Sequence, residues 1–453
     1  MAKRSIELTP SASSGATSTP RLGTVMRFQP KAGGAGIKQL EASGFRIASS
    51  REFHAASAIP NDFGGADVQY FERFGIAIVR RDSERLAPAL NRAFEQKTVS
   101  AARPEIAYHA LGTLASTRQD AEDEPEAADD APDANRAYLT GYRDGVNQLV
   151  DRLLGSNEVG TSRSRLIRFD ETALTWGLQA IGVPLSGLTG AGIKVAVLDT
   201  GFDETHPDFR GRAVTKKRFA SNSTDGDVIG HGTHCIGTAC GPLRPSSVPR
   251  YGVAHEAAIF AGKVLGDDGF GTDRSVIAGM DWALEQGCHI ISMSLGAVTK
   301  VGDQANDDYE QIGQVCLDAG AIVIAAAGNE SARPGRINPV GSPANASTIM
   351  AVGAINRRLR PAPFSCGGLN SGQEVDIAAP GADILSCLPG GQYARWDGTS
   401  MATPHVSGVA ALLAQSDPTF RGWALWARLL QLVRPLPFLS RDVGKGLVQA
   451  PKK

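Results

Sequence analysis

Three short segments place reactive residue types where a buried core would ordinarily have none. Asp199 ends the apolar run VAVLD, His231 stands between two glycines in GHGTH, and Ser400 lies in DGTSMATPHVSG, ahead of small and apolar residues. A serine hydroxyl is a weak nucleophile until an adjacent base takes its proton. Histidine titrates near neutral pH, and an aspartate can orient the histidine ring. The three residue types are therefore those of an acid, a base and a nucleophile for acyl transfer.

A fourth segment offers the hydrogen-bond donor that acyl transfer requires for its developing oxyanion. Asn329 ends AAAGN, where it follows an apolar run and a glycine, so we expect its amide to project from the carboxyl end of a strand. Taken alone, Ser400 could be a helix N-cap, and Asp199 could cap a helix or hold a loop through hydrogen bonds. Neither structural role explains why all the segments occur together.

The spacing of His231 and His234 allows a second interpretation. Histidines three positions apart can bind a metal ion on one helix face, but no HExxH pattern or cysteine pair supports this. A metal hydrolase stays an alternative. We expect His234, and likewise His405, to be packed in the core.

The elements that must position these residues alternate between strands and helices. The runs IKVAVLDT, AIFAGKVL, CHIISMSL, AIVIAAAG and TIMAVGAI read as strands, and TDRSVIAGMDWALEQG and NDDYEQIGQVCLDAG read as helices. Thr272 is the N-cap candidate of the first helix. Strands that are apolar on both faces and separated by helices predict an α/β fold, with a largely parallel sheet and helices on both faces. Functional residues of such sheets gather at the carboxyl ends of the strands.

The chain divides into four predicted regions. Residues 1–20 are rich in Ser, Thr and Ala and are predicted to be disordered, and residues 21–105 read as a small α+β domain. Residues 106–160 are predicted to be a linker with the acidic run DAEDEPEAADDAPD and one amphipathic helix, and residues 161–453 to be the main domain. A calcium-binding or basic-partner tail is the alternative for the acidic run. The helix is predicted from the apolar residues Tyr142, Val146, Leu149 and Leu153.

Charge and hydropathy argue against several classes of partner. The net charge is −1, which favours neither nucleic acid nor an anionic membrane surface. No apolar run reaches the ~18 residues of a membrane span. The first residues lack the apolar segment of a secretory signal, so we expect a cytoplasmic protein or export by a non-classical route. None of the six cysteines forms a CxxC pair, and we expect mostly free, buried thiols.

The segments VAVLDTGFDETHPDF, GHGTHCIGTA, SMSLG, AAAGNE and GTSMATPHVSG resemble the successive motifs of the subtilisin-like serine protease family. The resemblance runs from about Trp176 to Ala450, and five motifs in the right order are far more specific than any one of them. It implies a serine endopeptidase that hydrolyses peptide bonds through an acyl-enzyme. The roles that it implies are histidine orienter for Asp199, general base and acid for His231, nucleophile for Ser400 and oxyanion donor for Asn329.

The resemblance also implies how a polypeptide substrate is bound. Main-chain pairing with an added strand gives affinity with little demand on sequence. Small residues leave the pocket before the cut bond roomy, which favours a large apolar side chain there, whereas Ala297 stands where a further glycine is usual and could narrow the groove. The strand-pairing residues implied are Ser294, Leu295 and Gly296, and the pocket residues are Ala327, Gly328 and Gly341.

The sequence departs from the family in a calcium-binding segment. An Asn-rich loop is replaced by GPLRPSSVPRYG, which offers few of the oxygen ligands that calcium needs. Asp208, in HPDF, matches a carboxylate ligand of the family but its partners are missing. We therefore expect no required cofactor and no metal, with Asp208 as the one possible calcium ligand.

The order of elements in the N-terminal region resembles the inhibitory propeptide of these proteases. This implies a self-processing zymogen whose N-terminal domain is an intramolecular inhibitor or folding aid, cut off somewhere between about Ser100 and Asp170. An unrelated accessory domain is the alternative. For the whole chain, a second class of function is an inactive scaffold that binds peptides.

Overall fold

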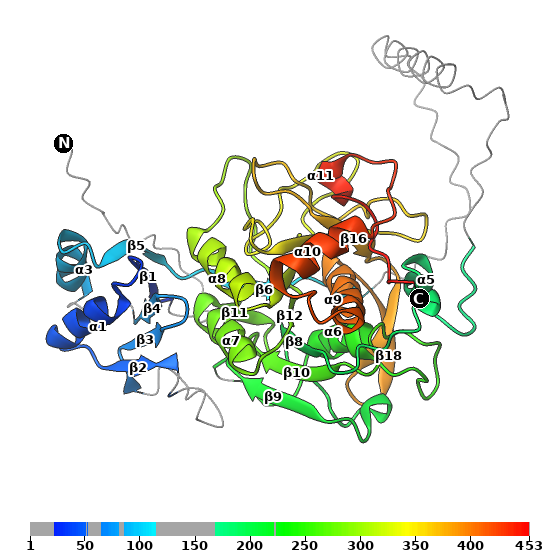
Figure 1. Cartoon of the computed structure of the whole chain (residues 1–453), viewed down its shortest axis with the longest axis horizontal. Helices are drawn as coiled ribbons and strands as arrows, with labels where there is room; N and C mark the ends of the chain where they lie inside the picture. Colours follow the sequence, from blue (N-terminus) through cyan, green and yellow to red (C-terminus); the bar gives the residue numbers. More distant parts are fainter. Residues whose placement is uncertain are drawn as a thin grey trace, which may run out of the picture.

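The centre of the molecule is a sheet of seven parallel strands (Figure 1). A computed structural model of the chain describes residues 22–50, 52, 65–80, 86–114, 168–221 and 223–452. Nearly every residue of the five inner strands is buried, as expected of a sheet that is covered on both faces. In spatial order the strands are β16 (Ile377–Pro380), β15 (Met350–Ile355), β14 (Ile322–Ala326), β12 (Ile290–Met293), β8 (Lys194–Asp199), β10 (Ala258–Lys263) and β9 (Val214–Arg218). The predicted α/β fold is confirmed.

Successive side chains of one strand enter different cores. Val195 and Val197 of β8 pack in the cluster that contains helices α6 (His231–Cys240) and α9 (Thr399–Ser416). The intervening Ala196 joins the cluster that contains α7 (Asp273–Glu285) and α8 (Asp307–Asp318). This alternation is the two-residue period of a strand, and it fixes which helices cover which face. Thr272 caps α7 as predicted, in a capping box with Ser275.

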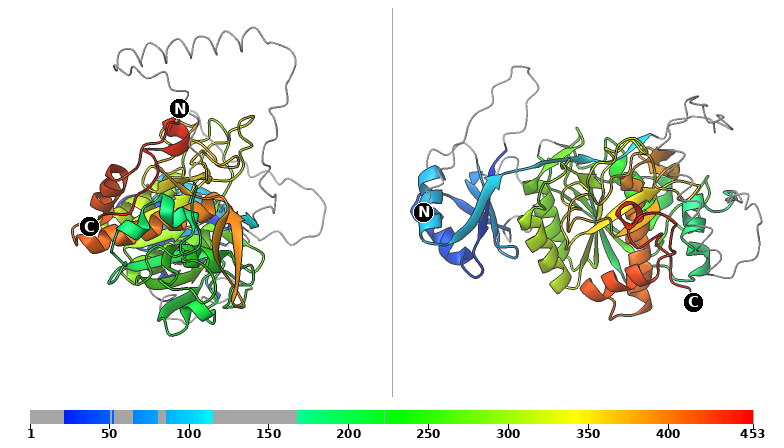
Figure 2. Two further views of the ribbon diagram at one scale, coloured as in Figure 1. Left: turned by 90° about the vertical axis from the view of Figure 1, so that its right-hand side faces the viewer. Right: turned by 90° about the horizontal axis from the view of Figure 1, so that it is seen from above.

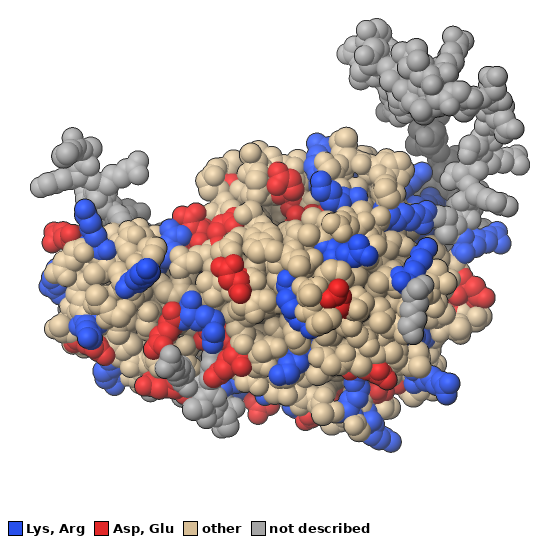
Figure 3. All heavy atoms as spheres, in the orientation of Figure 1, with Lys and Arg blue, Asp and Glu red and all other residues tan. Residues whose placement is uncertain are grey.

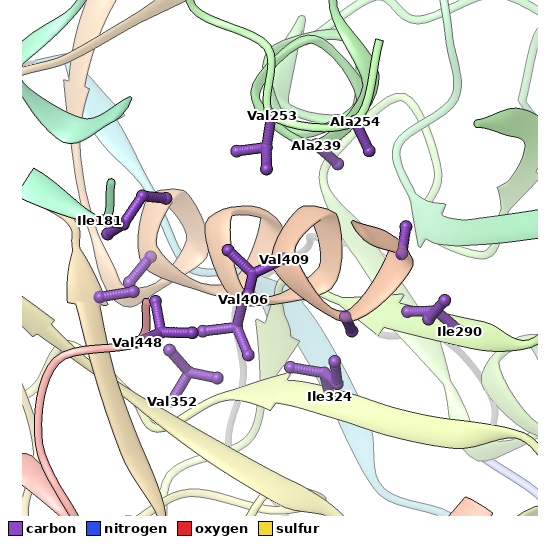
Figure 4. Close-up of a cluster of buried hydrophobic side chains, with 14 of the residues drawn as sticks. Ile181, Ala239, Val253, Ala254, Ile290, Ile324, Val352, Val406, Val409 and Val448 are labelled. Atoms are coloured by element: carbon purple, nitrogen blue, oxygen red, sulfur yellow. The ribbon is translucent and has the colours of Figure 1, made fainter. Parts of the chain in front are cut away.

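Helix α9 is buried along nearly its whole length, at the centre of the larger core (Figure 4). Val406 and Val409 lie among apolar side chains of the sheet, including Ile324 and Val352. Gly408 allows α9 to pack closely against Val253, because a Cβ at this position would lie 2.5 Å from Cβ of Val253. Helix α10 (Gly422–Gln431) packs on the same cluster.

The N-terminal residues form a separate α+β layer, which confirms the predicted small domain (Figure 1). Its sheet has the order β2-β3-β4-β1-β5, and one face is covered by its own two helices. The other face, with Val25, Phe74 and Ile78, packs in the same cluster as α7 and α8. Its elements are β1 (Thr24–Phe28), α1 (Gly33–Ala42), β2 (Ile47–Ser49), β3 (Val68–Phe71), β4 (Ile76–Val79), α3 (Leu86–Glu95) and β5 (Val99–Pro104).

Two short strands join the N-terminal domain to the rest of the chain. Strand β5 leads away from its sheet toward the larger domain (Figure 2), and β6 (Ala107–Ala110) then pairs antiparallel with both β11 (Phe270–Thr272) and β13 (Leu295–Gly296). After two more residues, β7 (Thr113–Leu114) pairs with β18 (Gln392–Asp397). Both β6 and β7 fall within residues 106–160, which the sequence predicts to be a linker. Their pairing partners lie far away in the sequence, so no local pattern indicates these two strands. The remaining elements are β17 (Ile384–Leu388), α5 (Trp176–Ala180), α11 (Ser440–Val443) and the 3-10 turns Val183–Leu185 and Pro207–Phe209.

Several predictions from sequence concern residues outside those that the structure describes. They are the disorder of residues 1–20, the acidic run and the amphipathic helix. On the face in Figure 3, basic and acidic side chains are interspersed over both domains. Among the described residues, no helix combines the length and hydropathy needed to cross a membrane.

Helix α9 should dominate the stability of the larger domain. In a Ser400→Ala background, Leu412→Ala is expected to lower the free energy of unfolding by about 2–5 kcal/mol, because it opens a cavity in a buried helix. Urea unfolding would measure this loss. The control Leu185→Ala, at a side chain that is 62% exposed, should change it by less than about 0.5 kcal/mol. Equal effects would contradict the assignment of α9 to the core.

Candidate active site

The polar residues singled out in the sequence lie together at the carboxyl edge of the parallel sheet. Asp199 is the last residue of β8, and Asn329 follows β14 by three positions. His231 is the first residue of α6, and Ser400 is the second residue of α9. Because the strands are parallel, the carboxyl ends of β8 and β14 lie at one edge of the sheet. Helices α6 and α9 begin at the same edge.

The Asp199 carboxylate orients the His231 ring. Its Oδ1 lies 2.7 Å from His231 Nδ1 and also accepts a hydrogen bond from the Thr200 backbone N–H at 2.7 Å. Both side chains are about 1% exposed. Burial is the largest single effect and lowers the pKa of the His231 imidazole, but the charge of Asp199, the neighbouring Cys235 and the hydrogen bonds to both together raise the pKa well above its ordinary value. The pair therefore favours an imidazolium, the species that forms when histidine takes a proton.

Asp227 holds the loop that carries the histidine, and sequence reasoning missed it. Its buried carboxylate accepts hydrogen bonds from Thr200 Oγ1 at 2.8 Å, Gly230 N at 2.8 Å, and both N and Oγ1 of Thr233 at 2.8 and 2.7 Å. The Thr200 hydroxyl in turn accepts from Gly232 N at 2.8 Å. An aspartate shortly before a helix is a capping signal, which could have pointed to Asp227.

The glycine after the histidine is a packing requirement. A Cβ on Gly232 would lie 2.2 Å from the carbonyl oxygen of Gly201, which follows Asp199 and Thr200. Any side chain at Gly232 would push α6 away from the end of β8. The 2.7 Å contact between Asp199 and His231 therefore depends on this close approach.

Ser400 is held by a reciprocal pair of hydrogen bonds. Its Oγ donates to the Ser294 carbonyl at 3.0 Å, and Ser294 Oγ donates to the Ser400 carbonyl at 2.8 Å. The Ser400 carbonyl is free for this because Pro404, four residues later in α9, has no N–H to donate to it. The Cys235 thiol donates to the same carbonyl at 3.5 Å.

The second ring nitrogen of the histidine, His231 Nε2, has a neighbour from the N-terminal part of the chain. Among the described residues Nε2 is buried and has no hydrogen-bond partner. A Cβ placed on Gly112 would lie 2.9 Å from Nε2 and 3.2 Å from Met401 Sδ, so the Gly112 backbone lies directly against the ring. The Ser400 hydroxyl donates to the Ser294 carbonyl in this arrangement, so its hydrogen must turn toward His231 before the ring can accept it.

Asn329 binds the backbone carbonyl just before Gly112. Its Nδ2 donates to the Leu111 oxygen at 2.7 Å. Its own Oδ1 accepts from Thr399 N and Thr399 Oγ1, both at 2.9 Å, which fixes the orientation of the amide. The carbonyl also passes close to Gly398, where a Cβ would lie only 2.4 Å from the Leu111 oxygen.

The backbone before Leu111 lies in the groove that the sequence assigned to substrate. β6 is the middle strand between β11 and β13, and Leu111 N donates to the Ser294 oxygen at 3.3 Å. The Leu111 side chain is 4% exposed and lies against Gly296, where a Cβ would be 2.8 Å from its Cδ1. Ser294, Leu295 and Gly296 thus contact an extended segment of the chain itself.

The predicted pocket residues form a backbone-linked wall beside this segment. Gly341 N donates to the Ala327 oxygen at 2.9 Å, and Ala297 N donates to the Ser342 oxygen at 2.8 Å. Gly328 N donates to the Thr399 hydroxyl at 3.2 Å, which ties this wall to the residue before Ser400. The Ala297 side chain is partly buried, next to the apolar cluster that contains Tyr108.

The other histidines have structural surroundings. His234 Nε2 lies 3.0 and 3.2 Å from the Ile384 and Ala394 carbonyls, and its ring stacks on Trp396 at 5.1 Å. Burial, with the charge of His231, lowers the pKa of His234 to about 3. His405 is buried too, which lowers its pKa to about 4. Both rings therefore stay neutral.

Potential metal ligands cluster at one place in the described chain, where Asp199, His231 and Cys235 lie within reach of one another. His234 does not belong to this group. The oxygens of Asp208, the possible calcium ligand, accept hydrogen bonds from Ser246 N at 2.8 Å, Tyr251 OH at 2.6 Å and Tyr393 OH at 2.9 Å. These donors satisfy the carboxylate without a cation.

Comparisons with known proteins agree with this architecture. Residues 190–435, more than half of the chain, match the model of the subtilase family. The chain is 37% identical to a subtilisin of Bacillus pumilus over 279 positions. The matched region covers 61% of this chain and 97% of that protein. The match to subtilisin BL of Lederbergia lenta is 39% over 281 positions, with 61% and 97% covered. An intracellular serine protease of Paenibacillus polymyxa is 38% identical over 269 positions, covering 57% and 79%.

The chain belongs to the subtilase family. It is a serine endopeptidase that acts on polypeptides, and its catalytic architecture is the parallel-sheet domain described above.

The carboxylate of Asp227 should matter for activity although it lies outside the groove. Asp227→Ala is expected to lower kcat/KM for a peptide substrate by about a hundredfold, since a small displacement of the His231 loop is enough to misalign the base. Steady-state hydrolysis measures this. The control Asp225→Ala removes a carboxylate in the same loop that is 82% exposed, and it should leave the rate unchanged. Equal activity of both variants would contradict a positioning role.

Proposed function

We propose that the chain is made as a zymogen whose N-terminal domain inhibits the endopeptidase and is then released by cleavage of the Leu111–Gly112 bond. The observation that carries the proposal is the 2.7 Å hydrogen bond from Asn329 Nδ2 to the Leu111 oxygen. An oxyanion donor acts on the carbonyl that is attacked. The register of the bound segment therefore supports one particular bond rather than a general blockage of the groove.

The proposed reaction assigns a role to each residue of the site. Ser400 Oγ attacks the Leu111 carbonyl carbon while His231 takes its proton, and Asn329 stabilises the negative oxygen. The C–N bond to Gly112 then breaks, and its nitrogen receives the proton from His231. Water hydrolyses the resulting ester and regenerates the serine. Asp199 keeps the ring oriented and stabilises the imidazolium.

Before cleavage, Ser400 Oγ and His231 Nε2 are not yet hydrogen-bonded to each other. The Ser400 hydroxyl donates to the Ser294 carbonyl at 3.0 Å, so its hydrogen must leave this acceptor before His231 Nε2 can take it. The nitrogen is ready for it, since it is buried and has no partner among the described residues. Gly112 lies against this nitrogen, close to where the leaving amine needs its proton.

Contacts between the domains support an inhibitor that stays bound after cleavage. The helix-free face of the N-terminal sheet packs on α7 and α8, and burial of apolar surface is the main favourable term. Arg73 pairs with Asp281 at 3.0 Å, and Arg27 with Asp307 at 2.9 Å. Such partly exposed pairs contribute little affinity but fix the orientation. The same packing against two helices supports a role as folding aid for a slow-folding parallel sheet.

Six free cysteines support a reducing compartment such as the cytoplasm. All six are buried and lie in the described part of the chain, and none is in a disulfide. Disulfides are common in oxidising compartments and rare in reducing ones.

Incubation of the full chain beside a Ser400→Ala copy tests the proposal. The native chain is expected to shorten and to yield a fragment that begins Gly-Thr-Leu, starting at Gly112, whereas the Ser400→Ala chain should stay intact. Amino-terminal sequencing and mass spectrometry read the cut. The exposed serine variant Ser347→Ala should behave like the native chain. If native and Ser400→Ala chains shorten identically, self-processing is wrong.

The rate of this cleavage should rise with pH. Only the neutral imidazole can accept a proton, and the pKa of His231 lies well above its ordinary value of 6.5. Below that pKa the rate should increase about tenfold per pH unit, and above it the rate should level off. Asp199→Asn removes the charge that raises the pKa, so the rise should move to lower pH with a lower plateau. A pH profile of single-turnover cleavage that is flat between pH ~6 and ~9 would contradict this.

A further inference from the structure

One carboxylate of the endopeptidase domain lies where a substrate side chain would be bound. Counting back from the Leu111–Gly112 bond, Tyr108 is the fourth residue, and its side chain is fully buried. Its ring meets that of Tyr309 edge to face, with centroids 5.9 Å apart. Its hydroxyl donates to Asp273 Oδ1 at 3.1 Å. The fourth subsite thus has an aromatic wall and an ionisable acceptor at its end.

Most donors to this carboxylate come from the N-terminal segment. Arg103 Nη1 and Ile106 N each donate to Asp273 Oδ2 at 2.6 Å, and Tyr108 donates to Oδ1. Tyr309, from α8, also donates to Oδ1 at 3.0 Å. When the segment leaves, only the Tyr309 hydroxyl stays among these donors. The fully buried carboxylate would then depend on water, or on the next peptide, to replace the others.

These donors differ in what they can select. The Ile106 N–H is a backbone group that every peptide supplies, so it does not discriminate between sequences. The Tyr108 hydroxyl belongs to a side chain, and phenylalanine would fill the same aromatic space without it. Burial, together with the charge of Asp273, raises the pKa of Tyr108 well above its ordinary value, so the hydroxyl stays a donor. A phenylalanine would cover the carboxylate and leave it short of a donor.

Asp273 lies at the positive end of a helix dipole. It is the first residue of α7, whose N-cap is Thr272. The positive end of a helix dipole stabilises a negative charge there. A hydrogen bond to a charged acceptor is stronger than one between neutral groups.

We infer that Asp273 is a specificity-determining residue, which selects polypeptide substrates with tyrosine at the fourth position before the cut bond. This inference rests on the proposed function, because it takes the segment 107–112 as bound in the manner of a substrate. Asp273 does not touch the reacting atoms and acts only on the choice of substrate.

The test uses the full chain after its own cleavage, diluted until the cleaved N-terminal domain leaves the groove, with peptides that carry the sequence of residues 105–114. One pair has tyrosine or phenylalanine at the position of Tyr108. The expected ratio of kcat/KM is about tenfold in favour of tyrosine, because a site built to bind a hydroxyl discriminates against its absence. A control pair carries tyrosine or phenylalanine at the position of His109. It should give equal values, since that side chain faces Phe270, which is 54% exposed.

Variants separate the carboxylate from the rest of the pocket. Asp273→Ala should bring the tyrosine to phenylalanine ratio close to one, and Asp273→Asn, which keeps the shape, should give an intermediate ratio. The control Asp318→Asn, an exposed acid at the far end of α8, should keep the native ratio.

Two outcomes would overturn the inference. The first is equal kcat/KM for both peptides with the native enzyme, a result that does not depend on the folding of any variant. The second is a tyrosine to phenylalanine ratio that stays unchanged in Asp273→Ala. Failure of the proposed function has a different signature. In that case the N-terminal domain would not be released at Gly112, and no peptide would be cut at its Leu–Gly bond.

Discussion

The 2.7 Å contact between two buried groups, Asp199 and His231, is the constraint on which the rest of the site depends. Burying a carboxylate is costly unless its charge is compensated, and the structure compensates it with the imidazole and a backbone N–H. The contact exists because β8 and α6 approach closely at Gly232 and because Asp227 organises the intervening loop. Several polar groups of the fold thus act together to orient one imidazole ring.

The groove follows from the same architecture. The carboxyl ends of the parallel strands form one edge, and the two buried helices begin there, so an extended segment that pairs with β11 and β13 passes directly over their first turns. This explains how one backbone carbonyl, that of Leu111, meets Asn329 while the next residue meets His231. Under the proposed function, the backbone sets the position of the cut bond, and Asp273 recognises the side chain at the position of Tyr108.

Sequence reasoning reached the parallel sheet, the small N-terminal α+β domain and the family, because each depends on local patterns or on motifs that are continuous in the chain. It singled out Asp199, His231, Asn329 and Ser400, which the fold collects at one edge. It missed Asp227, although its place shortly before a helix is a local capping signal, and it missed Asp273, whose partners from the N-terminal segment lie far away in the sequence. It also placed β6 in a linker, since short strands that pair only with distant edges carry no periodic signal of their own.

The strands on either side of the Leu111–Gly112 bond have different partners: β6 pairs with β11 and β13, and β7 pairs with β18. While the bond is intact, the N-terminal domain occupies the groove at a high effective concentration, whatever the amount of protein present. If the bond is cut as proposed, the same domain becomes a separate molecule, and its binding to the groove follows mass action. Under this proposal, cleaved chains at high concentration would remain inhibited, and dilution alone would raise their activity.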